Sequence, residues 1–104
     1  MATFTGNENH DIPLSEAAQW TANYRNANPG QTKGHYFGGT AINSVLTQSG
    51  CVGLRMYYAT TNENIKQLVI VGVDASGNDL VNGLILDRSI LCPPDCGNVN
   101  VLNS

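Results

Sequence analysis

The run Leu68-Val69-Ile70-Val71-Gly72-Val73 constrains the fold more than any other segment of the chain. Its residues are apolar at consecutive positions, so an extended strand through them would be apolar on both faces. Such a strand lies at the centre of a sheet, where both faces are covered and other strands flank it. The segment therefore predicts a sheet whose central strand is residues 68–73.

Two further segments predict the neighbours of this strand. From Cys51 the period of the pattern is two, and one strand face collects Val52, Leu54, Met56 and Tyr58. Leu80 to Asp87 predicts a third strand around Leu84-Ile85-Leu86. Polar residues 61–64 and 74–79 separate the three segments and are typical of turns. We therefore expect a three-stranded antiparallel meander.

Helical spacing precedes Cys51. Ser15 followed by Glu16 indicates a helix N-terminus, with the serine as cap and the acid in the first turn. One helical face then carries Ala17, Trp20, Thr21 and Tyr24, and Asn28-Pro29-Gly30 ends the helix. A second short helix is expected from about Thr40 to Gly50, with an apolar face formed by Ala41, Ile42, Val45 and Leu46.

The order of these elements predicts an α+β fold. We expect two N-terminal helices packed on the three-stranded antiparallel meander, with an irregular C-terminal tail. Residues 1–11 are polar without periodicity and are expected to form an extended N-terminal arm. A chain of 104 residues fits one domain, so residues 1–104 are predicted to form a single α+β domain.

Composition excludes some partners and favours others. Charged residues make up 12% of the chain, about half of the usual share, and a surface of this kind favours close association of identical subunits. The net charge of −3 and the scattered basic residues argue against nucleic-acid binding. No apolar run reaches the length of a membrane span, and no signal peptide is recognisable. We expect a cytoplasmic protein, although export by a route without an N-terminal mark stays open.

The segment Cys92-Pro93-Pro94-Asp95-Cys96-Gly97, with a third thiol at Cys51, permits three interpretations. The thiols could bind a metal as Cys51, Cys92 and Cys96 with His35 or His10 as the fourth ligand. A disulfide between Cys92 and Cys96 would require the chain to turn at Pro94-Asp95. The favoured interpretation is that Cys92 and Cys51 pack as small apolar residues while the prolines turn the chain. The odd number of cysteines fits a reducing compartment.

Four motifs in this order resemble a family of short bacterial proteins, mainly from Bacteroidota. They are Trp20-Thr21-x-x-Tyr24-Arg25, Gly50-Cys51-Val52-Gly53-Leu54-Arg55-Met56-Tyr57, Val71-Gly72-Val73-Asp74 and Cys92-Pro93-Pro94-x-Cys96-Gly97. The resemblance covers most of residues 14–104. The family has no established activity, so the resemblance implies a compact, free-standing bacterial protein and carries no catalytic residues.

Other patterns do not form a recognisable site. Asp74 to Asp79 carries oxygen ligands at alternate positions, but Gly77 is at the fourth position instead of the sixth, and Ile85 stands where a calcium loop has its bidentate glutamate. His10 and His35 are the two histidines, and neither is marked as the partner of a serine or cysteine nucleophile. Gly38-Gly39-Thr40 lacks the lysine of a phosphate loop. We therefore expect no catalytic residues and no cofactor.

The large aromatic residues of the chain either complete the core or form a protein interface. Tyr57 and Tyr58 must point to opposite strand faces, so at least one of them leaves the core. Tyr36 and Phe37 lie in a glycine-flanked loop. We take Tyr36, Phe37 and Tyr57 as interface candidates. The expected function is a non-enzymatic structural or interaction module that self-associates into a homo-oligomer or filament, through the sheet edge or the N-terminal arm. The alternative is a thiol-based redox or metal-binding protein.

Overall fold

The computed structural model describes residues 3–104 and divides the chain into two compact units. Unit 1 consists of Phe37–Ser89 together with the N-terminal residues through Glu8. Unit 2 consists of Asn9–Tyr36 and Ile90–Ser104. Helices and antiparallel sheets are both present, so the predicted α+β class is confirmed. The single-domain boundary of 1–104 stays a prediction.

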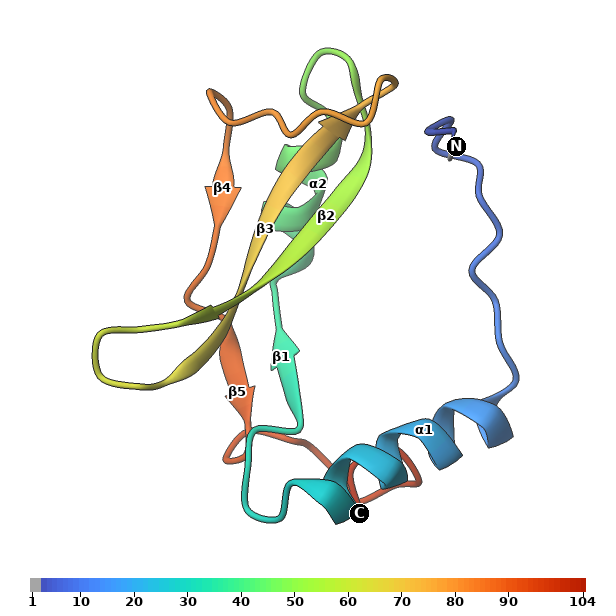
Figure 1. Cartoon of the computed structure of the whole chain (residues 1–104), viewed down its shortest axis with the longest axis vertical. Helices are drawn as coiled ribbons and strands as arrows, with labels where there is room; N and C mark the ends of the chain where they lie inside the picture. Colours follow the sequence, from blue (N-terminus) through green and yellow to red (C-terminus); the bar gives the residue numbers. More distant parts are fainter. Residues whose placement is uncertain (1–2) are drawn as a thin grey trace. The chain divides into compact units, whose positions relative to one another are not determined.

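Unit 1 is built on the predicted antiparallel meander (Figure 1). Its strand order is β2-β3-β4, and its elements are α2 (Gly39–Leu46), β2 (Cys51–Thr60), β3 (Lys66–Asp74) and β4 (Ile85–Leu86). Along β2 and β3 the register pairs Leu54 with Gly72 and Tyr57 with Val69, after an irregularity between Cys51 and Gly53. The predicted third strand shrinks to the two residues of β4, because residues 80–83 turn away after a single bridge between Val73 and Asp79.

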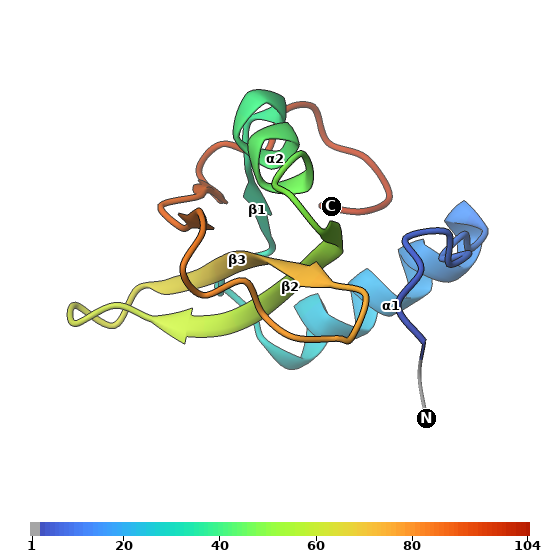
Figure 2. The same ribbon diagram turned by 90° about the horizontal axis from the view of Figure 1, so that it is seen from above.

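Helix α2 covers one face of the β2–β3 pair, as Figure 2 shows from above. Gly72 marks this face, since a Cβ atom added there would lie 2.9 Å from the Cys51 sulfur and 3.0 Å from the amide nitrogen of Gln48, just beyond α2. Ile70 lies two residues away on the same face and is fully buried, as is Val45 of α2. Val71 and Val73 are also buried and lie on the opposite face of β3, so the strand is covered on both faces, as the apolar run predicted.

The N-terminal arm is partly fixed by its own chain. A Cβ atom added at Gly6 would lie 2.7 Å from the Val52 carbonyl oxygen, so the arm passes directly against the start of β2. The Phe4 ring lies over Gly77 in the turn after β3, and its centroid is 5.8 Å from the Arg55 guanidinium carbon. Both contacts fall within unit 1, and neither was predicted from the polar sequence of the arm.

Unit 2 contains α1 (Leu14–Ala27) and a two-stranded antiparallel sheet of β1 (Gly34–Tyr36) and β5 (Ile90–Cys92). Figure 1 shows β1 and β5 side by side, and Tyr36 is paired with Ile90. This sheet was not predicted. The expected packing of both N-terminal helices on the meander is also not matched, since α1 belongs to unit 2 while the meander belongs to unit 1.

The start of α1 differs from the predicted cap. Pro13 is the N-cap in an extended conformation, and its carbonyl accepts hydrogen bonds from the amides of Glu16 and Ala17, at 3.1 Å each. Ser15 already lies inside the helix, so its predicted role as cap is wrong. Glu16 in the first turn and Arg25 in the last turn have the signs that the helix dipole favours.

Candidate functional site

The C-terminal cysteines form a disulfide between Cys92 and Cys96. Their Cα atoms are 4.6 Å apart, because the chain turns after β5 and the Asp95 amide donates a 3.0 Å hydrogen bond to the Leu91 carbonyl. The favoured expectation, in which Cys92 packs as an unbonded apolar residue, is wrong, and the disulfide interpretation holds. Since disulfides persist in oxidising compartments, the cysteine count no longer supports a reducing one.

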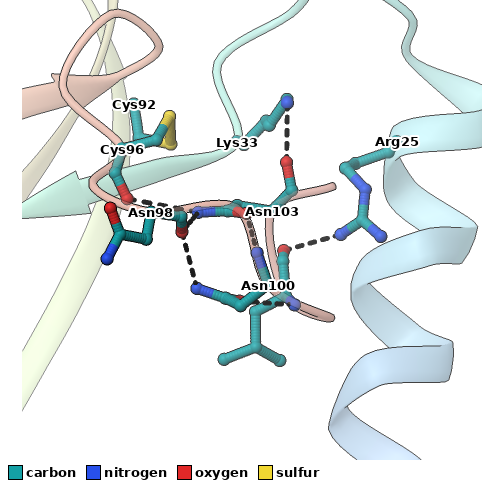
Figure 3. The surroundings of a disulfide bond; sticks show 8 residues. Arg25, Lys33, Cys92, Cys96, Asn98, Asn100 and Asn103 are labelled. Carbon is teal, nitrogen blue, oxygen red and sulfur yellow. Dashed lines mark hydrogen bonds between the residues drawn. A yellow bond between two sulfur atoms is a disulfide. The ribbon is translucent and has the colours of Figure 1, made fainter.

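Asparagine side chains order the tail that follows this disulfide (Figure 3). The Asn103 amide donates to the carbonyls of Cys96 and Asn98, at 3.2 and 3.1 Å, and its oxygen accepts from the Asn100 backbone at 2.8 Å. Lys33 donates to the Asn103 carbonyl at 2.8 Å, and Arg25 of α1 donates to the Leu102 carbonyl at 2.6 Å. The tail is therefore tied to the disulfide turn and to the rest of unit 2.

The predicted metal ligands are not brought together. Cys92 and Cys96 are bonded to each other, and Cys51 begins β2 in unit 1, where its thiol donates to the Gly53 carbonyl at 3.2 Å. His35 pairs with Leu91 across the β1–β5 ladder, and its burial lowers the pKa of the imidazole below the ordinary value. Within residues 3–104 no three side chains among His, Cys, Asp and Glu are grouped as a metal site would require.

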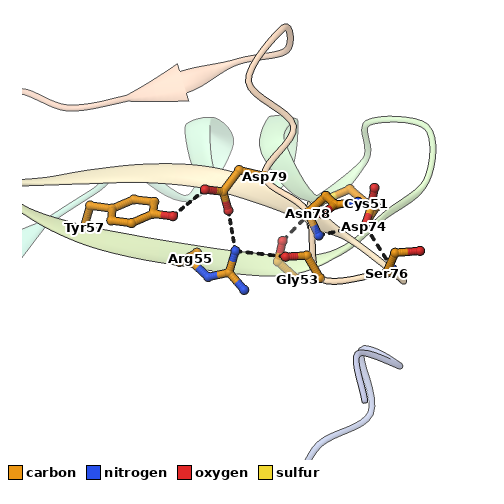
Figure 4. A network of polar contacts seen from close by, with 9 residues as sticks. Cys51, Gly53, Arg55, Tyr57, Asp74, Ser76, Asn78 and Asp79 are labelled. Carbon is orange, nitrogen blue, oxygen red and sulfur yellow. Dashed lines mark hydrogen bonds and ion pairs between the residues drawn. The ribbon is translucent and has the colours of Figure 1, made fainter. Parts of the chain in front are cut away.

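A polar cluster on β2 was missed from the sequence (Figure 4). Asp79 accepts hydrogen bonds from the Tyr57 hydroxyl and the Arg55 guanidinium, and Arg55 also donates to the Gly77 carbonyl at 3.1 Å. Strand alternation does place Arg55 and Tyr57 on one face. Asp79, however, was assigned to a turn only, and the Val73–Asp79 bridge is what brings its carboxylate to the sheet.

This cluster shifts the protonation equilibria of its members. The hydrogen bond from Tyr57 has the largest effect and lowers the pKa of the Asp79 carboxyl. Burial opposes it, and the hydrogen bond and charge of Arg55 lower the pKa further. The same hydrogen bond raises the pKa of Tyr57, and burial adds to the rise. The hydrogen bond to Asp79 likewise raises the pKa of Arg55. At neutral pH the cluster therefore holds a carboxylate between a neutral phenol and a guanidinium cation.

An open pocket of about 300 Å³ lies beside this cluster in unit 1. Its lining residues are Gln48, Ser49, Asp79, Leu80, Val81, Asn82 and Gly83. The Gln48 oxygen accepts from the Leu84 amide at 2.8 Å, and its nitrogen donates to the Val45 carbonyl at 2.9 Å. The side chains of Gln48 and Asp79 thus form hydrogen bonds within the chain itself. The lining contains neither a histidine nor a cysteine that could act as base or nucleophile.

The aromatic interface candidates differ in their surroundings. Tyr36 is 60% exposed at the end of β1, Phe37 is half-buried, and Tyr57 is 46% exposed with its hydroxyl bonded to Asp79. Tyr58 was not chosen from the sequence, yet it is 97% exposed. It lies in β2, where alternation alone could not decide which tyrosine faces outward.

Compared with known protein families, curated proteins and solved structures, the chain shows no match. The resemblance to short Bacteroidota proteins therefore stays a prediction. In residues 3–104 no helix has the length and apolar content needed to cross a membrane.

Proposed function

We propose that the protein is a non-enzymatic module that associates with copies of itself. The observation that carries this proposal is that each unit leaves large apolar side chains uncovered. Helix α1 has no buried residue, although it carries Trp20, which is 55% exposed, and Tyr24. Among the described residues of unit 1, the buried hydrophobic ones are Val45, Ile70, Val71 and Val73.

Exposed aromatic side chains of this kind are typical of interfaces, where they bury much area at small entropic cost. The low charge of the chain supports the same function, since little electrostatic repulsion opposes the approach of identical surfaces. The interface candidates lie on both units, with Tyr36 in unit 2 and with Phe37 and Tyr57 in unit 1, so each unit offers an aromatic contact.

Sedimentation velocity over a wide range of protein concentration tests the proposal. We expect the weight-average mass to rise with concentration and the larger species to dissociate on dilution. A filament would appear as fast-sedimenting material and as fibres in electron micrographs. A constant monomer mass at every concentration would overturn self-association.

The Cys92–Cys96 disulfide favours a second candidate function, thiol–disulfide exchange. In that function the thiolate of an external dithiol attacks one sulfur, the other leaves as thiolate, and a second attack releases the reduced protein and the oxidised dithiol. Equilibration with glutathione buffers measures the reduction potential. A potential within the glutathione range supports exchange, whereas one far below it supports a structural disulfide.

A further inference from the structure

We propose that the outer edge of β2 pairs with β2 of a second copy as antiparallel strands, around a two-fold axis at Tyr57. The inference rests on the proposed self-association and names its contact surface. Two three-stranded sheets would then form one continuous sheet across the two copies.

The edge of β2 is long and unpaired. In the ladder order β2-β3-β4, β2 has one neighbour, and the described residues form no other ladder on its far side. The opposite edge strand, β4, has only two residues. A long edge strand with open peptide groups is a template for pairing with another chain. The β2 edge is thus the part of unit 1 best suited to add a strand.

Two hydrogen bonds reveal which peptide groups of β2 point outward. The Leu80 amide donates to the Gly72 carbonyl at 2.8 Å, so the peptide groups of Gly72 face away from β2. Gly72 is paired with Leu54, which makes Leu54 a residue whose own peptide groups face away from β3. The 2.9 Å bond from the Thr61 amide to the Ile65 carbonyl agrees with this alternation at the other end. The residues whose peptide groups face away from β3 are therefore Leu54, Met56, Tyr58 and Thr60, and these are the outward-facing residues of the edge.

The ends of the free edge determine the register. On one side Gly6 lies against the Val52 carbonyl, so the arm occupies the edge before Leu54. On the other side β2 ends at Thr60, and Thr61 begins the turn. A two-fold arrangement that uses the whole free edge is centred midway between Leu54 and Thr60, at Tyr57. Each outward-facing residue then exchanges hydrogen bonds with an outward-facing residue of the second copy.

The side chains are self-complementary in this register. Met56 lies opposite Tyr58 of the second copy, a favourable pairing of thioether and aromatic ring. Both are more than half exposed in the single chain, at 54% and 97%. Arg55 lies opposite Ala59 of the second copy, so like charges do not face each other. These matches favour a second copy of this chain over an unrelated extended peptide.

The usual protection of an edge strand is absent from this stretch. Natural edges are blocked by lysine, proline or a bulge. Between Leu54 and Thr60 there is neither lysine nor proline, and the irregularity lies earlier, between Cys51 and Gly53. Arg55 is the one charged residue of the stretch, and Asp79 neutralises it within the same chain.

Cysteine cross-linking tests the register. In a Cys51→Ser background, Tyr57→Cys should form an intermolecular disulfide under mild oxidation, because the Cα atoms of a central non-hydrogen-bonded pair lie about 4.5 Å apart. Ala59→Cys is the matched control, since its counterpart would lie at least about 13 Å away along the strand. Cross-linking of Ala59→Cys but not of Tyr57→Cys would overturn the register.

Tyr58→Pro tests the edge itself. The Tyr58 amide faces outward, so the substitution removes a donor for the second copy without removing one for β3. We expect the dimer to be lost, with unchanged circular dichroism, and Tyr58→Lys should act in the same way through charge. Val99→Lys, at an exposed apolar side chain outside unit 1, should leave the dimer intact.

The outcomes separate the two proposals. If the wild-type chain associates while both Tyr58 variants associate equally well, the β2 edge is not the contact, and self-association stands. If the wild-type chain is monomeric at every concentration, self-association and edge pairing both fail. Loss of association in the Tyr58 variants, together with the Tyr57 cross-link, supports the β2 pairing.

Discussion

The Tyr57 hydroxyl donates a hydrogen bond to the Asp79 carboxylate, which joins the edge strand to the loop that follows β3. Arg55 reaches the other carboxylate oxygen, so one acid receives both a phenol and a guanidinium. The Tyr57 bond has the largest influence on the acidity of Asp79.

Removal of this donor should change the Asp79 titration. Tyr57→Phe is expected to raise the pKa of the Asp79 carboxyl toward its ordinary value, because a hydrogen bond to the charged form is lost. Carboxyl carbon chemical shifts followed by NMR against pH measure the change. Tyr58→Phe is the matched control, and an equal shift in that variant would contradict the assignment.

Stability should fall at both extremes of pH through this pair. The pKa of Asp79 is depressed in the folded chain, so its contribution is present above the unfolded value near 4 and is lost as pH falls through the folded value. The pKa of Tyr57 is raised, so its contribution is present below about 10 and is lost as pH rises through the folded value. Urea unfolding should show a weaker acid dependence in Asp79→Asn and a weaker alkaline dependence in Tyr57→Phe.

Gly77 should tolerate no side chain. Its φ of +83° costs an alanine about 1–2 kcal/mol, and the added Cβ would lie 2.5 Å from the Phe4 ring. Gly97→Ala is the control, since its φ is +73° but nothing lies within 4 Å. We expect Gly77→Ala to lower the free energy of unfolding more than Gly97→Ala does. In a Phe4→Ala background, Gly77→Ala should lower the free energy of unfolding by no more than Gly97→Ala does. If the losses from Phe4→Ala and Gly77→Ala simply add in the double variant, the Phe4 contact is contradicted.

The disulfide should stabilise the tail. Replacing Cys92 and Cys96 by serine opens a five-residue loop, which costs about 2 kcal/mol by loop entropy. Faster hydrogen exchange is expected in residues 97–104, whose carbonyls and amides are bonded around Asn103. Cys51→Ser should change neither the stability nor the hydrogen exchange of residues 97–104, because a serine can donate to the Gly53 carbonyl as the thiol does. Unchanged exchange in the tail of the double variant would disprove the coupling.

The sequence predicted the elements whose patterns are long enough to be read. β2 and β3 followed from period two and from the apolar run, and α2 followed from its spacing. Strand β1 was missed because Gly34-His35-Tyr36 is too short for a period, and its partner β5 lies far along the chain. Pairing over such a distance leaves no local signal.

The candidate site was predictable only in part, for a similar reason. The Cys92–Cys96 disulfide could be proposed from spacing but not decided, since the outcome depends on how the diproline turns. Asp79 could not be connected to Tyr57, because the contact depends on the path of residues 75–79 back to β3. The Phe4 contact depends on the missing side chain at Gly77, which the sequence cannot place in space.

Because Tyr36 pairs with Ile90, the segment between them could be removed or replaced without separating the strands β1 and β5. All of Phe37–Ser89 is inserted where a hairpin of unit 2 would have its connecting turn. The entropic cost of closing a loop rises by only about 0.6 kcal/mol for each doubling of loop length, so a hairpin can carry an insertion of this size. An Asn-Gly turn joining Tyr36 directly to Ile90 would restore an ordinary hairpin. The insertion site is therefore a natural position for exchanging one module for another between two strands that already pair.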